Sequence, residues 1–226
     1  MKVISVLMQK GGSGKTTLVE SLAVAAMADE AVAIVDLDPQ STACKWGDRR
    51  NAEPAIMSVQ PARLPQTLKV LREKGASLVL IDTPPRAADA AMAAAQAADL
   101  ILIPSRPTIN DLETIATTRD LISGAGASAK IAVVLNGIPP QGRQREQAEN
   151  AVREMGLYIC PVAFGHRSAF THGAVLGQTA QEFDPSGKAA GEIKQLYKFT
   201  SKLLNSLTPK QENTDGKEIS RSGAGA

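Results

Sequence analysis

A glycine-rich run at residues 10–17, Lys-Gly-Gly-Ser-Gly-Lys-Thr-Thr, carries the residue types that bind a nucleotide triphosphate. Its glycines allow the backbone to wrap tightly and to turn its N–H groups toward an anion. Lys15 supplies a positive charge for the β- and γ-phosphates, and the Thr16 hydroxyl is placed to ligate magnesium. A glycine turn that opens an ordinary helix is the alternative, but the Lys-Thr pair closes the run in the right place for a phosphate-binding loop, or P-loop. The predicted contacts within it are Gly11, Gly12, Ser13, Gly14, Lys15, Thr16 and Thr17.

Acidic residues follow two apolar stretches and could complete a magnesium–phosphate site. The first stretch ends in Asp36-Leu37-Asp38-Pro39-Gln40, and the second ends at Asp82, followed by Thr83-Pro84-Pro85. We predict that Asp36 and Asp82 lie near the magnesium ion together with Thr16, with Asp82 acting through water because magnesium retains much of its hydration shell. A simple Asp-Pro turn at a strand end is the alternative for residues 36–40.

The elements that must position these residues are short, continuous apolar runs that alternate with helical stretches. The predicted strands are 3–7, 31–35, 77–81, 99–103, 130–135 and 157–163, with a weaker one at 55–59. Continuous apolar runs suit strands that are covered on both faces, and therefore a parallel sheet. We predict an α/β fold, a doubly wound and mostly parallel sheet with helices on both faces, whose ligands bind beyond the carboxyl ends of the strands.

Composition limits the class of protein. The 226 residues fit one sizeable domain, and because 43% of them are hydrophobic but only 3% aromatic, the core must consist of Ala, Val, Ile and Leu. A net charge of +2 means that any nucleic-acid surface must be a local patch. Cys44 and Cys160 form neither a metal spacing nor a disulfide framework, which fits a reducing cytoplasm. The chain opens directly on a strand, so we expect no signal peptide, and no apolar run approaches the roughly 20 residues of a membrane span.

The pattern Lys-Gly-Gly-x-Gly-Lys-Thr, which begins at Lys10, resembles the deviant Walker A motif of the ParA/MinD family. The Asp-x-Asp-Pro-Gln segment and the Asp82 strand resemble that family's switch I and Walker B motifs, and the resemblance covers about residues 1–206. It implies ATP and Mg²⁺ as cofactors and a nucleotide-sandwich homodimer in which Lys10 reaches the phosphates in the opposite subunit. It also implies that Asp38 positions the attacking water, so the predicted catalytic residues are Lys10, Lys15 and Asp38. A surface lysine beside a loop remains the alternative for Lys10.

One further stretch and one further residue resemble the family. The stretch from Pro104 to Asp111 resembles a segment near the family's dimer interface, although Asp111 could instead cap a helix over 112–122. Asn136 ends a predicted strand where the family uses an asparagine to bind adenine, with an Asn-Gly turn as the alternative.

Basic residues near the C-terminus could contact DNA. Arg167 follows the last strand in a segment that resembles the family, and Lys194, Lys198 and Lys202 recur every four residues on the helix predicted over 186–206. Such a stripe can neutralise DNA phosphates without reading bases. A solvated lysine face and a simple surface arginine are the alternatives.

The resemblance implies a small ParA-type partition or positioning ATPase with slow basal turnover, without the N-terminal helix-turn-helix domain of larger forms. Expected partners are a ParB-like or other adaptor that stimulates hydrolysis and nonspecific DNA, so we expect a cytoplasmic, nucleoid-associated protein without stable membrane association. Residues 207–226 are polar and are expected to be disordered. The alternatives are a MinD-like positioning ATPase, a metabolic ATP-dependent ligase or kinase on a related fold, and a nucleotide-regulated scaffold.

Overall fold

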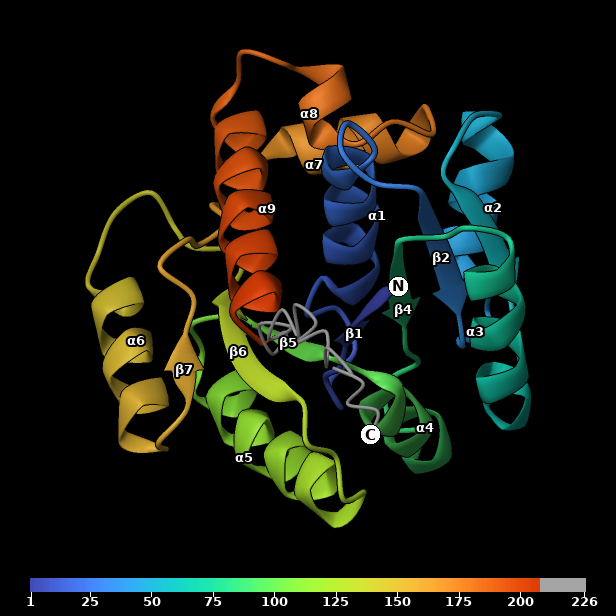
Figure 1. Ribbon diagram of the computed structural model, residues 1–226. Coiled ribbons are helices and arrows are strands. Elements are labelled where there is room, and N and C mark those ends of the chain that lie inside the picture. The colour runs from blue at the N-terminus through green and yellow to red at the C-terminus, as the bar shows by residue number, and fades with distance from the viewer. Residues whose placement is uncertain (208–226) are drawn as a thin grey trace, which may run out of the picture.

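The computed structural model describes residues 1–207; the C-terminal segment predicted to be disordered lies almost entirely outside that range. A seven-stranded, all-parallel sheet forms its centre, with helices on both faces (Figure 1). The strands are β1 Lys2–Val6, β2 Val32–Asp36, β3 Ala55–Ser58, β4 Leu78–Asp82, β5 Leu100–Ser105, β6 Lys130–Leu135 and β7 Tyr158–Ile159. The helices are α1 Lys15–Ala26, α2 Thr42–Arg50, α3 Leu64–Glu73, α4 Ala88–Ala97, α5 Ile109–Gly124, α6 Gln144–Glu154, α7 Ser168–Val175, α8 Ala180–Phe183 and α9 Lys188–Leu207.

The strand order β3-β2-β4-β1-β5-β6-β7 confirms the predicted doubly wound fold. The first strand, β1, lies between β4 and β5, and the chain winds outward from it in both directions. Within the sheet, Asp36 of β2 is the register partner of Asp82 of β4, which is in turn the partner of Val6 of β1. The strands that precede the P-loop and both acidic motifs therefore end at the same edge.

Successive residues of each strand point alternately into two hydrophobic cores, one on each face of the sheet. On one face, Ile4 and Val6 pack with residues of α1, α2, α8 and α9. On the other face, Val3 and Leu7 pack with α3, α4, α5 and α6, and the alanines of α4 allow that helix to lie close to the sheet. Figure 1 shows α1 and α9 on one side of the sheet and α4 and α5 on the other. Both faces are buried, which explains the continuous apolar strands in the sequence.

Two predicted elements differ from the observed ones by more than two residues at one end. The strand predicted over 157–163 contains only β7. Cys160 donates to the Val133 carbonyl oxygen, but the next donor to β6 is Phe164, which bonds to the Leu135 carbonyl oxygen, so the regular ladder is interrupted over residues 161–163. The helix predicted over 112–122 is α5, which begins at Ile109. Within residues 1–207, no helix combines the length and the apolar character that crossing a membrane requires.

Candidate active site

The P-loop joins β1 to α1 in the predicted strand–loop–helix arrangement. Gly12 and Gly14 have φ values of +71° and +94°, a region that favours glycine, and Gly14 is the N-cap of α1. A Cβ atom on Gly14 would lie 2.1 Å from the side-chain nitrogen of Asn136, which donates a hydrogen bond to the Ser13 carbonyl oxygen at 2.8 Å. The residue predicted at the base pocket is therefore packed directly against the phosphate loop.

Lys15 lies inside this loop, with its side chain largely buried. Its ammonium group donates to the Lys10 carbonyl oxygen at 3.3 Å, which closes the loop around the lysine. Burial lowers the pKa of Lys15, while the nearby Asp82 and Asp38 carboxylates act in the opposite direction. Lys15 and Asp38 line one cavity of about 290 Å³, together with the loop glycines, Thr16, Thr17, Gln40, Thr83 and Pro85. Such a cavity brings the predicted phosphate and water contacts together.

Thr16 and Asp82 form the part of the site that fits a magnesium ion. The Thr16 hydroxyl donates to one oxygen of the Asp82 carboxylate at 2.6 Å. The other carboxylate oxygen is buried without a hydrogen-bond partner among the described residues, as is the Ser13 hydroxyl. Burial raises the pKa of Asp82 to about 7. A hydroxyl next to an unpartnered carboxylate oxygen is a donor set that suits a hard divalent cation.

The Asp36 carboxylate, which we predicted to lie near the magnesium ion, accepts backbone N–H groups through both of its oxygens. One of its carboxylate oxygens accepts the Asp38 N–H at 2.9 Å, and the other accepts the N–H groups of Ala43 and Cys44 at 3.0 and 3.3 Å. The Ala43 and Cys44 donors are free N–H groups in the first turn of α2, and such groups attract a carboxylate. Asp36 therefore holds the switch I backbone, and Asp38, two residues later, lines the phosphate cavity.

Lys10 lies at the entrance of the loop and is turned away from its own phosphate cradle. Its ammonium group is 2.7 Å from a carboxylate oxygen of Asp111, whose side chain is only 5% exposed, whereas that of Lys10 is 35% exposed. Asp111 lies within the first turn of α5 and does not cap it, because the Thr108 side chain accepts its N–H as the N-cap. Our capping alternative for Asp111 is thus wrong, and no local pattern predicts its pairing with Lys10.

A second cavity, of about 450 Å³, adjoins the P-loop beside Asn136, the residue that we predicted to bind adenine. Asn136 and Gly137 line it from the end of β6, and Phe170 and Thr171 line it from α7. Arg106 joins them, with a guanidinium nitrogen 3.6 Å from the position that a Cβ on Gly12 would occupy. Sequence reasoning missed Arg106, although its place directly after a buried strand, at the sheet edge that carries the site, was a usable signal.

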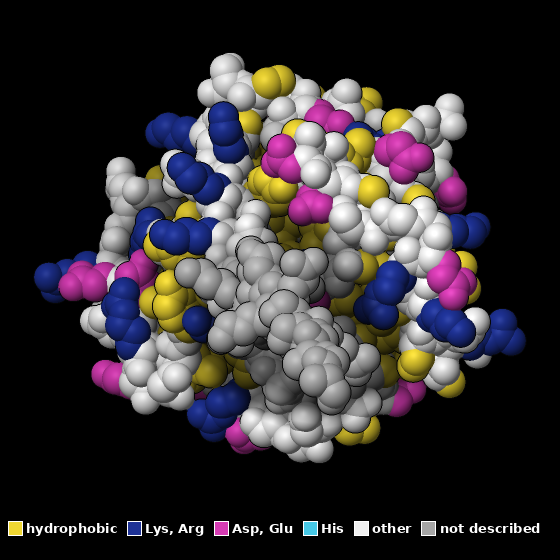
Figure 2. All heavy atoms as spheres, viewed as in Figure 1, with side chains coloured by type: hydrophobic (Ala, Val, Ile, Leu, Met, Phe, Trp, Pro, Cys, Tyr) yellow, Lys and Arg dark blue, Asp and Glu magenta, His cyan; other side chains and the backbone are white. Residues whose placement is uncertain are grey.

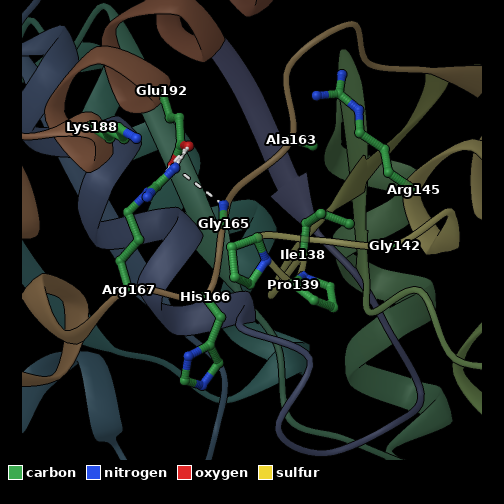
Figure 3. A pocket seen from close by; sticks show the side chains of 11 residues that line it. Ile138, Pro139, Gly142, Arg145, Ala163, Gly165, His166, Arg167, Lys188 and Glu192 are labelled. Atoms are coloured by element: carbon green, nitrogen blue, oxygen red, sulfur yellow. Dashed lines mark hydrogen bonds and ion pairs between the residues drawn. The ribbon is translucent and has the colours of Figure 1, made fainter.

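The basic residues predicted to contact DNA differ in their surroundings. The Arg167 guanidinium forms an ion pair with Glu192 of α9, which also accepts the Gly165 N–H, and Figure 3 shows Arg167 directed toward that carboxylate. In contrast, Lys194, Lys198 and Lys202 are exposed on α9. Figure 2 shows Lys and Arg side chains gathered on the side of the molecule where α9 and α6 lie. The charge of Arg167 is therefore partly neutralised, whereas the α9 lysines face solvent.

Comparison with known proteins places these motifs in one family. Residues 4–215 match the family model described as the CobQ/CobB/MinD/ParA nucleotide binding domain. The chain is 34% identical over 208 residues to maintenance of carboxysome distribution protein A from Gloeobacter kilaueensis, covering 90% of this chain and 94% of that protein.

Solved structures share the fold. The apo structure of McdA from Cyanothece has a TM-score of 0.75 and 17% identity, covering 90% of this chain and 99% of that one. The cell division ATPase MinD from Pyrococcus furiosus has a TM-score of 0.70 and 23% identity, covering 89% and 99%.

Proposed function

This chain belongs to the CobQ/CobB/MinD/ParA family of nucleotide-binding domains, and from that premise we propose an ATP-gated dimer that positions a large cargo over DNA. It is a ParA/MinD-type ATPase that uses ATP and Mg²⁺. The proposal concerns the finer steps: ATP-dependent pairing, nonspecific DNA binding and an adaptor that stimulates hydrolysis.

The placement of Lys10 is the observation that carries the proposal. Lys15 already serves the phosphate cavity of its own loop, whereas Lys10 is half-exposed beside Asp111 at the outer edge of that loop. A lysine in this position is available to the phosphates of a second copy that approaches face to face. Pairing through ATP then follows, because each site gains a positive charge from its partner.

Within one subunit, each site residue has a separate role in ATP hydrolysis. Thr16 and Asp82 hold magnesium, which supplies charge neutralisation on the phosphate oxygens when bound. Lys15 holds the terminal phosphates, and Asp38 orients the attacking water, while Asn136 and Arg106 contact the nucleoside. Catalysis of this kind is mostly positioning and electrostatics, so we expect slow basal turnover.

The DNA-binding surface is the exposed lysine row of α9, Lys194, Lys198 and Lys202. Arg167 contributes less than the spacing suggested, because Glu192 neutralises much of its charge. A relative named for carboxysome distribution supports a large protein assembly as the cargo, with an adaptor linking it to the ATPase. Repeated DNA binding and release would then move the cargo.

Light scattering of the Asp38→Ala variant tests the pairing step. This variant should bind ATP, hydrolyse it slowly and accumulate as a dimer with ATP but remain monomeric with ADP. Adding Lys10→Ala should return the ATP-bound protein to monomer, whereas Lys69→Ala, at an exposed position of α3, should not. A dimer that survives Lys10→Ala would remove Lys10 from the interface and overturn the proposal.

A further inference from the structure

We propose that Arg50 is a positioning residue for ATP hydrolysis, because it clamps the switch I helix α2 to the α7–α8 turn. Switch I here means residues 36–40, and α2 follows it directly. The inference rests on the ATPase function proposed above. It adds a second requirement: Asp38 is held in place from the far end of α2 as well as by its own loop.

Arg50 makes contacts that suit a clamp. Its two terminal nitrogens donate to the two carboxylate oxygens of Glu182, each at 2.7 Å, and its side chain is 9% exposed. The guanidinium carbon lies 5.1 Å from the centre of the Trp46 ring, and one nitrogen also donates to the Gly177 carbonyl oxygen at 3.4 Å. A planar, forked cation can satisfy all of these partners at once, whereas a lysine cannot.

The other end of α2 is tied to the water-positioning residue. Asp36 accepts the N–H groups of Ala43 and Cys44 in the first turn of the helix and, through its second oxygen, the N–H of Asp38. Since one buried carboxylate bridges α2 and Asp38, a displacement of the helix shifts the Asp38 backbone. Trp46 adds a third contact from the middle of α2, donating to the Gln178 carbonyl oxygen at 3.5 Å.

The α7–α8 turn, which Arg50 contacts, is itself held by hydrogen bonds and close packing. Besides pairing with Arg50, Glu182 accepts the N–H and the hydroxyl of Thr179, both at 2.9 Å, in a capping box at the start of α8. Gly177 has a φ of +69°, and a Cβ there would lie 2.4 Å from the Arg50 backbone nitrogen. Only glycine permits so close an approach of the two backbones.

The α7 helix extends this fixed surface to the nucleotide. Phe170 and Thr171, near its start, line the cavity proposed to hold the nucleoside, and α7 ends at Val175, just before Gly177, whose carbonyl oxygen accepts a bond from Arg50. The clamp therefore fixes switch I relative to the wall of the base pocket. Loosening it would misplace Asp38 while leaving the phosphate and base contacts intact.

Steady-state kinetics of Arg50→Lys and Glu182→Gln test this inference, with Arg49→Lys as the matched control. Both clamp variants should lower kcat about tenfold, with KM for ATP within about twofold of wild type, since a small misplacement of a catalytic group is costly. The double variant should be no slower than either single one, because both remove the same contact. Arg49→Lys should keep the wild-type kcat, because it removes only a single exposed hydrogen bond, to the Ala174 carbonyl oxygen.

Fluorescence gives a readout that stability alone would not move. Trp46 is the one tryptophan of the chain and lies under the Arg50 guanidinium, so its emission reports on the clamp. Addition of Mg²⁺-ATP should change this emission in the wild type and in Arg49→Lys, and by less than half as much in the clamp variants, at temperatures well below each unfolding midpoint.

An unchanged kcat in both folded clamp variants would overturn the inference, as would a loss of kcat that disappears once each variant is assayed well below its unfolding midpoint. Wild-type protein without ATP turnover would instead overturn the proposed function, and this inference with it.

Discussion

Glu20 and Asp82 are carboxyl groups that the fold buries close to the phosphate loop. Burial raises the pKa of Glu20 to about 8, with the Asp82 charge adding to the shift, and raises that of Asp82 to about 7. Asp82 has a chemical reason to be there, since its unpartnered oxygen faces a site that suits magnesium. Glu20 lies one helical turn beyond Thr16 on α1, and its ionised form is a net cost to the fold.

Glu20→Gln should therefore stabilise the protein increasingly as the pH rises. Because the folded-state pKa of about 8 lies above the ordinary value of 4.5, the folded protein holds this proton more tightly than the unfolded chain does. The corresponding stability is complete below about pH 4.5 and is lost as the pH rises to about 8. Glutamine cannot ionise, so it avoids this loss.

Urea unfolding of both proteins across this pH range measures the difference. The free energy of unfolding of the variant, relative to wild type, should increase by up to about 1.4 kcal/mol per pH unit and level off above about pH 8. If the difference in free energy of unfolding between the two proteins stays constant from pH 4.5 to 8, Glu20 is not held protonated by its surroundings.

At the scale of elements, the P-loop requires glycine at position 14 for two reasons, its backbone conformation and the space beside it. Gly14 has a φ of +94°, and its missing side chain leaves room for Asn136 to reach the Ser13 carbonyl oxygen. The end of β6 and the loop before α1 therefore form one unit, so a change at Gly14 alters both the phosphate contacts and the base contact.

Gly14→Ala should weaken ATP binding by about 100-fold, because the new Cβ would displace Asn136 and strain the loop. Gly75→Ala is the matched control: Gly75 also has a positive φ, +87°, but nothing lies within 4 Å of the added Cβ. It should lower the free energy of unfolding by about 1 kcal/mol without a change in ATP affinity. Calorimetric titration separates the two, and equal affinities for both variants would contradict the coupling of Asn136 to the loop.

The part of this site that could be predicted is the part that follows strands recognisable in the sequence. The P-loop, Asp36, Asp38 and Asp82 each stand at the end of a strand that is visible in the sequence, and parallel topology brings those ends together. The Lys10–Asp111 and Arg50–Glu182 pairs could not be predicted in this way, because they join residues 101 and 132 positions apart. Their formation depends on how α5 and α8 pack, which no local pattern records. The same holds for the bonds that Asp36 accepts from Ala43 and Cys44, because these two residues lie in α2, a helix that was not predicted.

At the scale of the whole molecule, the distribution of charge matters more than its sum. The chain carries a net charge of only +2, yet Lys194, Lys198 and Lys202 are exposed along one helix. Arg145 and Arg153 of α6, which packs on the opposite face of the sheet from α9, are paired with Glu149, as Arg167 is with Glu192. The α9 lysines are therefore the part of this basic surface that remains available to phosphates.

Replacing these three lysines with alanine should weaken DNA binding to every sequence alike. The magnitude of the slope of log K against log salt for the ATP-bound dimer should decrease by up to about five, since the dimer loses two rows of three lysines and each lysine contributes about 0.9. ATP hydrolysis without DNA should stay unchanged, because α9 does not line the phosphate cavity. Lys69→Ala on α3 provides the control, and an unchanged slope in the triple variant would move the DNA surface elsewhere.

Binding to a random-sequence DNA duplex with ATP, with ADP and without nucleotide, across a salt series, tests the central claim most directly. The account predicts salt-sensitive binding with ATP alone, because only the ATP-bound dimer brings two lysine rows onto one duplex. Equal binding in all three states would contradict nucleotide control of the surface. If the protein binds no DNA in any nucleotide state but still dimerises with ATP, the proposal that it positions its cargo over DNA is wrong.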